Sequence, residues 1–72
     1  MYDVSEVKVR DLIVRLEAAG WQLKRVKGSH RQFRHPNRGG VVTVAGHPGK
    51  DVPAGTLKAI LRGAGLEEKE KD

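Results

Sequence analysis

KGSHRQFRHPNRGGVVTVA, residues 27–45, is the stretch that decides the fold. Residues 30–35 predict a strand, and residues 41–45 predict another because they are rich in β-branched side chains. The glycines and proline of residues 36–40 are typical of a hairpin loop, and residues 27–29 predict a turn ahead of the first of these strands. The middle of the chain therefore predicts antiparallel strands joined by short connections.

Side chains alternate between the two faces of a strand, which assigns the residues of the strand at 30–35 to its faces. If Phe33 faces a hydrophobic core, Arg31 lies on the same side. His30, Gln32 and Arg34 then share the opposite, open face. This face is predicted to be polar and basic.

A further strand is predicted before the turn. Trp21 and Leu23 alternate with Gln22 and Lys24, which is the pattern of a strand with one buried face. By this alternation Lys24 lies on the face opposite the two apolar side chains.

The sequence before Trp21 predicts a helix over residues 6–19. Ser5 is a suitable N-cap, Glu6 complements the helix dipole, and Gly20 fits the left-handed position after the last turn. Apolar residues recur at helical spacing, namely Val9, Leu12, Ile13 and Leu16.

A second helix is predicted after an irregular segment, residues 46–50, which contains two glycines and a proline. Asp51 is expected to cap this helix, with Pro53 in its first turn. Gly65 followed by Leu66 is typical of a helix end. The apolar stripe of the helix consists of Leu57, Ile60, Leu61 and Ala64.

The predicted order is α-β-β-β-α, an α+β fold in which a three-stranded antiparallel sheet carries two helices on one face. One domain over residues 1–66 suits this length. Residues 67–72 are charged and lack apolar side chains, so we expect them to be a disordered tail.

Composition restricts the function. The chain has no cysteine and no apolar run of membrane-spanning length, so we expect a soluble cytoplasmic protein without disulfides. Residues 18–50 hold seven Lys/Arg and no Asp/Glu, a formal charge of +7, whereas the remainder carries −2. Such segregation favours a polyanion-binding surface over a merely solvated face. An anionic membrane is disfavoured as the partner, because the first helix mixes acidic and basic side chains.

His30 is the candidate for chemistry within this basic segment. Histidine is the side chain that exchanges protons near neutral pH, and Lys and Arg hold phosphates. Together they suggest chemistry on a nucleic-acid backbone, although the charge pattern does not separate RNA from DNA. If the substrate is RNA, a neutral imidazole can accept the proton of a 2′-hydroxyl. The alternative is a histidine that only forms a hydrogen bond across the hairpin.

Other polar residues have weaker candidate roles. Lys24, Lys27 and Arg34 are candidates for contacts with phosphates and for stabilising the charge at five-coordinate phosphorus. Ser29 either stabilises the turn, which we favour, or contacts the RNA backbone. Lys50, close to the start of the second predicted helix, would add positive charge there.

The two remaining histidines are assigned structural roles. His35 lies on the core side of its strand, where packing or loop hydrogen bonding is expected. His47 is expected to stabilise its loop, although the general acid is left open between His47, a lysine and water. No metal or other cofactor is predicted, because the basic segment has no carboxylate for a hard cation and His30 and His35 lie on opposite faces.

Three ordered blocks of this sequence resemble the HicA family of small toxins from toxin–antitoxin pairs. The first block is Ala19-Gly20-Trp21, and the second contains Lys27-Gly28-Ser29-His30 and Phe33-Arg34-His35-Pro36. The third is His47-Pro48-Gly49-Lys50 with Gly55-Thr56-Leu57-Lys58 and Ile60-Leu61-Arg62. The resemblance extends over the whole chain except the charged tail.

This resemblance implies a fold like the double-stranded-RNA-binding domain and a toxin of type II systems that cleaves mRNA. The family's essential histidine corresponds to His30. Many members have a second histidine directly after it, where this chain has Arg31. The alternative function is a non-catalytic RNA-binding module. The resemblance also implies an antitoxin of the HicB type, which we expect to be acidic where it meets the basic segment. The toxin alone is expected to be a monomer or weak dimer.

Overall fold

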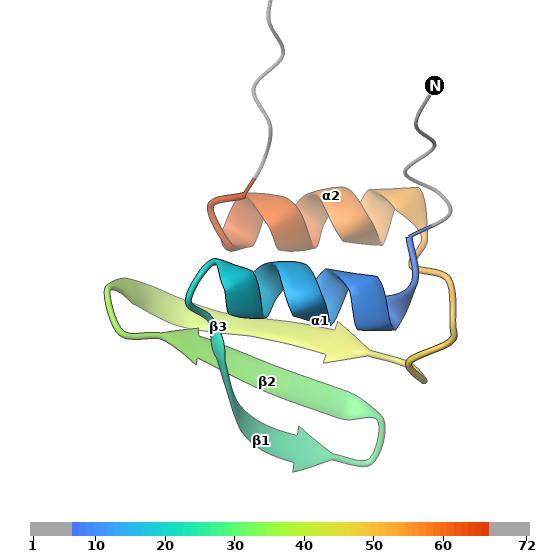
Figure 1. Ribbon diagram of the computed structural model, residues 1–72, viewed down its shortest axis with the longest axis horizontal. Coiled ribbons are helices and arrows are strands. Elements are labelled where there is room, and N and C mark those ends of the chain that lie inside the picture. Colours follow the sequence, from blue (N-terminus) through green and yellow to red (C-terminus); the bar gives the residue numbers. More distant parts are fainter. Residues whose placement is uncertain (1–6, 67–72) are drawn as a thin grey trace, which may run out of the picture.

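A computed structural model describes residues 7–66. It contains α1 (Val9–Ala18), β1 (Gln22–Lys27), β2 (His30–His35), β3 (Arg38–Ala45) and α2 (Ala54–Gly63). The predicted α-β-β-β-α order is confirmed, and the strands form one antiparallel sheet in the order β1-β2-β3. Figure 1 shows that β3 lies nearest the helices and β1 farthest from them.

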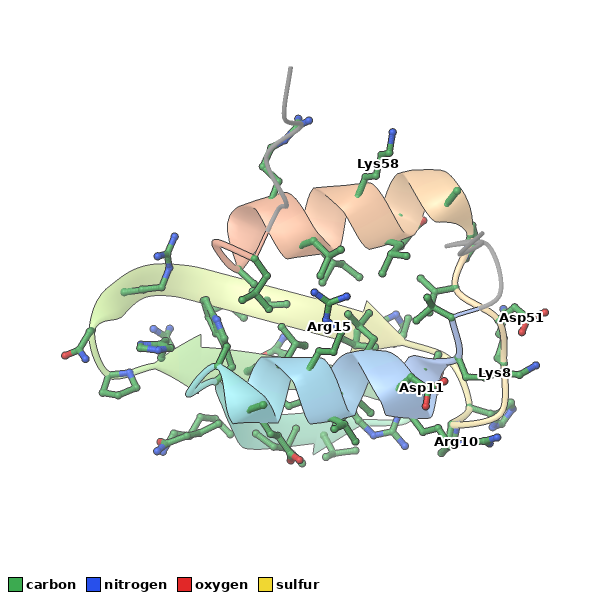
Figure 2. All side chains as sticks on the ribbon, turned by 45° about the horizontal axis from the view of Figure 1, so that its top comes forward. Lys8, Arg10, Asp11, Arg15, Asp51 and Lys58 are labelled. Carbon is green, nitrogen blue, oxygen red and sulfur yellow. The ribbon has the colours of Figure 1, made fainter. Side chains whose placement is uncertain are left out.

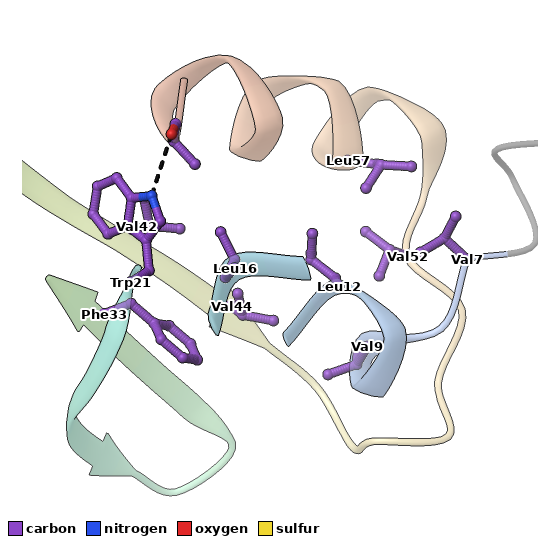
Figure 3. Close-up of a cluster of buried hydrophobic side chains, with 11 residues drawn as sticks. Val7, Val9, Leu12, Leu16, Trp21, Phe33, Val42, Val44, Val52 and Leu57 are labelled. Atoms are coloured by element: carbon purple, nitrogen blue, oxygen red, sulfur yellow. Dashed lines mark hydrogen bonds between the residues drawn. The ribbon is translucent and has the colours of Figure 1, made fainter. Parts of the chain in front are cut away.

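A single hydrophobic core joins both helices to one face of the sheet (Figure 3). Leu12 and Leu16 of α1 and Phe33 of β2 are completely buried, and Leu57 brings α2 into the same cluster. Burying one such side chain contributes roughly 1.5–3 kcal/mol, so these few residues dominate the stability of so small a fold. Trp21 also donates a hydrogen bond of 3.2 Å from Nε1 to the backbone oxygen at the C-cap of α2.

The first helix begins at Val9, three residues later than predicted, and the predicted cap at Ser5 lies outside the described residues. Backbone oxygens of the loop at 46–50 satisfy the first turn instead. The N–H of Val9 donates to the carbonyl of Lys50 at 2.9 Å, and that of Arg10 donates to Pro48 at 3.0 Å. The loop before α2 is therefore also the cap of α1.

The first helix ends as predicted, in a Schellman motif. Gly20 has a φ of +100°, and its N–H donates to the carbonyl of Glu17 at 3.0 Å. The N–H of Trp21 donates to the carbonyl of Leu16 at 2.9 Å. This geometry turns the chain directly from α1 into the sheet. Gly65 and Leu66 end α2 in the same way, which confirms the predicted stop.

The predicted cap of α2 is wrong. Asp51 lies two residues before the N-cap residue, Pro53, and too early to accept from the first turn. Its carboxylate instead forms an ion pair of 2.6 Å with Lys8, and Figure 2 shows the two side chains side by side. The N–H of Val52 donates to the carbonyl of Val7 at 2.8 Å, so this contact ties the start of α1 to the segment before α2.

The last strand is longer than predicted, because β3 begins at Arg38 rather than at Val41. His35 pairs with Arg38, so only Pro36 and Asn37 remain in the loop. The ladder is irregular between Phe33 and His35, where β3 has two additional residues. Gly40, with a φ of +84°, provides the left-handed conformation in this irregular part of β3.

Residues 67–72, for which a disordered tail was expected, lie outside the described part of the chain. Neither described helix is long and apolar enough to cross a membrane.

Candidate nucleic-acid interface

The two faces of β2 separate as the alternation predicted. Phe33 is completely buried and Arg31 is half-buried on the side that faces the helices. His30, Gln32 and Arg34 are all exposed on the opposite side of the strand. This open face of the sheet is not covered by either helix, because both helices share the core on the other face.

A tight turn sets the position of His30. Gly28 has a φ of +60°, whereas the φ of Ser29 is not positive. A positive φ at the first of the two turn residues alone is typical of a two-residue type II′ hairpin. The turn places Lys27 directly opposite His30 in the β1–β2 ladder. Side chains at such positions project from the same face with Cβ atoms roughly 4.5–5.5 Å apart. The hairpin therefore brings a cation next to the imidazole.

Ser29 has a backbone role in the same region. Its carbonyl accepts a hydrogen bond of 3.0 Å from the N–H of Gly46, the residue that follows β3. The side chain of Ser29 is exposed. Ser29 lies in the turn, but its hydroxyl forms no hydrogen bond within residues 7–66, so the choice between a turn role and an RNA contact stays a prediction.

A β-bulge in β1 changes which cations lie on the open face. Leu23 pairs with Phe33, and the next pair is Arg25 with Gln32, so Lys24 has no partner in the ladder. The ladder therefore does not assign Lys24 to a face, and its predicted place opposite Trp21 and Leu23 stays a prediction. Beyond the bulge the alternation is reversed, and Arg25 joins Lys27 on the face of His30.

Sequence reasoning missed Arg25, although the sequence contains a signal for the bulge. The apolar residues Trp21 and Leu23 are two positions apart, but the next apolar residue, Val26, follows after three. An additional residue in the strand keeps all three on the helix side. Leu23, predicted to be buried, is 43% exposed because β1 lies at the sheet edge farthest from the helices.

We call Arg25, Lys27, His30 and Arg34 the basic open face. All four side chains are exposed, and they come from two adjacent, paired strands. Within residues 7–66 none of the four forms an ion pair, and β1 and β2 contain no carboxylate. The positive charge of this surface is therefore available to a polyanion.

The side chain of His30 is exposed and makes no hydrogen bond within residues 7–66. Its ring has no hydrogen-bond partner among the described residues, and its neighbour on the β3 side is Ala45, whose side chain is a methyl group. A neutral imidazole in this position has one nitrogen free to accept a proton. It can do so beside Lys27, a group that stabilises negative charge.

The loop at 46–50 lies at the same end of the sheet. Arg31 donates a hydrogen bond of 3.0 Å from Nη1 to the carbonyl of Gly46, from the helix side of β2. Arg31, which stands where many members of the resembling family have a second histidine, therefore lies on the face opposite His30. Lys50 is exposed and near the start of α2, as predicted, and its aliphatic carbons lie against Gly46.

His47 contributes to this loop through its backbone. Its carbonyl accepts a hydrogen bond of 2.9 Å from the N–H of Lys50, which closes a turn. The side chain is exposed and has no hydrogen-bond partner within residues 7–66. The backbone contact does not involve the imidazole, so the loop role expected of the His47 side chain and its use as a general acid both stay predictions.

His35 has the structural role predicted for it. Its Nδ1 accepts from the N–H of Asn37 at 3.0 Å, so Nε2 carries the proton and donates to the carbonyl of Ala19 at 3.0 Å. The ring also meets Trp21 edge-on, with centroids 5.4 Å apart. A Cβ at Gly20 would lie 2.6 Å from Nε2, so the ring fills this space.

The donor set does not resemble a metal centre. No cluster of three or more His, Cys, Asp or Glu side chains occurs in the described part of the chain. The basic open face has a single imidazole among cations, and hard cations prefer oxygen ligands.

The sequence matches one known family over most of its length. The family described as the HicA toxin of bacterial toxin–antitoxin systems matches residues 9–66, from the start of α1 to the end of the α2 stop signal. No curated protein matches the chain with significant similarity. The chain belongs to the HicA toxin family and is a toxin of a toxin–antitoxin system.

Proposed function

We propose that this toxin is a metal-independent endoribonuclease of a type II system, which cleaves mRNA with His30 as the proton-transfer residue. The observation that carries the proposal is the pairing of Lys27 with His30 on an exposed face without carboxylates. Exposure suits a long, flexible substrate, and the neighbouring cations suit its phosphates.

The reaction follows from these groups. His30 accepts the proton of a 2′-hydroxyl, and the resulting oxyanion attacks the adjacent phosphorus. The bond from phosphorus to the 5′-oxygen breaks, which leaves a 2′,3′-cyclic phosphate and a 5′-hydroxyl. Lys27 and its neighbours Arg25 and Arg34 stabilise the additional charge at five-coordinate phosphorus. The leaving oxygen takes its proton from His47, a lysine or water.

RNA binding by this surface relies on charge rather than on stacking. Trp21 and Phe33, the aromatic side chains nearest the sheet, are buried in the core. Contacts therefore fall on phosphates and sugars, through the basic open face, the exposed hydroxyl of Ser29 and the ammonium of Lys50. Weak dependence on base sequence is the expected consequence.

The test is cleavage of a labelled RNA in the presence of EDTA. The wild type should cut the RNA to products with cyclic phosphate ends, and it should bind but not cut RNA with 2′-O-methyl groups. Gln32→Ala, on the same face and strand, is the matched control and should cut normally. RNA bound without cleavage by the wild type would establish the alternative, a non-catalytic RNA-binding module.

We further propose that the antitoxin of this system is of the HicB type and covers His30. A partner with carboxylates facing the basic open face would associate quickly and hide the chemistry. Co-expression with the neighbouring reading frame should yield a complex without nuclease activity, and the toxin alone should sediment as a monomer or weak dimer. A complex that cuts RNA at the full rate would contradict the proposal.

A further inference from the structure

The two edges of the sheet differ in how they are protected from additional strands. At one edge, β1 carries Lys24, Arg25 and Lys27 within six residues and is interrupted by the bulge. Charges and bulges of this kind prevent edge pairing. At the other edge, residues 39–45 of β3 contain no charged side chain and no proline. The end of β3 is therefore an unprotected edge.

Ladder geometry shows which backbone groups point out from this edge. The N–H of Gly46 donates to the carbonyl of Ser29, so these two residues occupy a hydrogen-bonded position of the antiparallel ladder. Such positions alternate, which turns the backbone of Val44 toward β2. The N–H and C=O groups of Thr43 and Ala45 then point away from the sheet and have no strand partner within residues 7–66.

A groove runs beside these groups, between β3 and α2. One part has a volume of about 300 Å³ and is lined by Val42 and Thr43 of β3 and by Thr56, Ala59, Ile60 and Gly63 of α2. A second part of about 260 Å³ shares Thr43, Thr56 and Ile60 and extends past the end of β3 to Lys50 and to Asp51, whose carboxylate is already paired with Lys8. The two parts form one continuous groove without a charged side chain along its middle.

We propose that this groove binds an extended segment of a partner protein as a fourth strand on β3. Its backbone would bond to Thr43 and Ala45, and its apolar side chains would enter the groove against Ala59 and Ile60. Arg38 at the start of β3 and Lys50 beyond its end are both exposed. The complementary segment is therefore apolar in its centre and carries carboxylates at its ends.

Two other occupants fit less well. RNA needs cations along its backbone, and the middle of the groove has none. A second copy of this chain carries a net charge of +5, and pairing β3 with β3 would join two basic open faces in one sheet. Like charges at this distance oppose association. The groove contains none of the four residues of the basic open face and shares only Lys50 with the proposed RNA contacts, so the proposal does not depend on the nuclease chemistry.

The experiment titrates the labelled protein with the capped peptide Asp-Val-Thr-Val-Thr-Val-Asp and follows backbone amides by NMR. The amides of Thr43 and Ala45 should shift and become protected from hydrogen exchange. A peptide with lysine at both ends should bind about fivefold more weakly, since two exposed ion pairs are lost. A peptide with proline at its centre should not bind.

Two variants locate the site. Thr43→Pro removes an outward N–H without removing a bond to β2, and it should weaken peptide binding about tenfold. Its control is Thr43→Val, which keeps the N–H. Ala59→Glu, which places a carboxylate in the groove, should also prevent binding. Its control is Lys58→Glu, because Figure 2 shows Lys58 pointing away from the rest of the molecule. Both controls should bind the peptide like the wild type.

Several results would overturn the proposal. A wild type that sediments as a dimer, together with a monomeric Thr43→Pro variant, would show that a second copy of the chain occupies the edge. Shifts of the same amides by an RNA oligonucleotide but not by the peptide would assign the groove to RNA. Unchanged edge amides at millimolar peptide, or equal binding by Thr43→Pro and Ala59→Glu, would show that no strand is added there.

Discussion

Alternate side chains of β2 lie in opposite environments, one set facing the helices and the other exposed on the open face of the sheet. On the helix side, Phe33 is completely buried, Arg31 holds the carbonyl of Gly46, and both ring nitrogens of His35 have backbone partners. On the open side, His30 and Arg34 are exposed and unpaired within residues 7–66. One six-residue strand therefore carries both the core and the candidate site.

The difference between the two faces of β2 is clearest in its two histidines, His30 and His35. His35 is held between Ala19, Asn37 and the edge of Trp21, and both of its ring nitrogens have hydrogen-bond partners. His30 has no such partners in the described part of the chain and lies opposite Lys27. Residue type alone does not distinguish a hydrogen-bonded histidine from an exposed one without a partner, whereas the face of the strand does.

The largest expected effect is on the helix side. Phe33→Ala should lower the free energy of unfolding by about 3–5 kcal/mol, because it removes a completely buried aromatic ring from a thin core. Urea unfolding followed by circular dichroism measures this change. Gln32→Ala, the adjacent residue on the open face, should change stability by less than about 0.5 kcal/mol. Equal losses for the two variants would contradict the separation of the faces.

A smaller effect is expected when the fixed histidine is removed. His35→Ala loses two hydrogen bonds and the edge contact with Trp21, which should cost about 2 kcal/mol. The variant should unfold at a lower temperature but retain RNA binding at temperatures where it is folded. His30→Ala is the control and should unfold like the wild type. A normal unfolding temperature for His35→Ala would show that its contacts are unimportant.

The smallest effect tests the bulge. Lys27→Ala should weaken RNA binding severalfold and reduce the slope of log affinity against log salt by about 0.7, the value for one phosphate contact with single-stranded RNA. Arg25→Ala should behave similarly. Lys24→Ala should have a smaller effect because Lys24 is outside the ladder. Titrations at several salt concentrations measure this, and a larger effect for Lys24→Ala would favour the regular alternation instead.

Local patterns predicted the architecture well because each element has its own signal. The helical spacing of Leu12 and Leu16, the glycine stop at Gly20 and the alternation around Phe33 all survive in the fold. The start of α1 was not predictable in this way. Its first N–H groups are satisfied by backbone oxygens of Pro48 and Lys50, about forty positions away in sequence, and no local pattern reports such a contact.

The candidate site was predicted in part for the same reason. The face of His30 follows from strand alternation, and the turn at Gly28 brings Lys27 opposite it. The bulge at Lys24 reverses the alternation in β1, so Arg25 was missed. The three-residue spacing of Leu23 and Val26 marks the bulge in the sequence. Both side chains are exposed in the structure, however, so the apolar pattern of β1 is a weaker guide to a buried face than the pattern around Phe33.

The central claim is that the free imidazole of His30, and not RNA binding by its neighbours, performs the chemistry. The most direct test measures the cleavage rate and the RNA dissociation constant of His30→Ala beside the wild type, in EDTA. We expect cleavage to fall at least about 100-fold, the usual contribution of a proton-transfer group, while RNA affinity changes less than about twofold. Cleavage at the wild-type rate by folded, RNA-binding His30→Ala would contradict the claim.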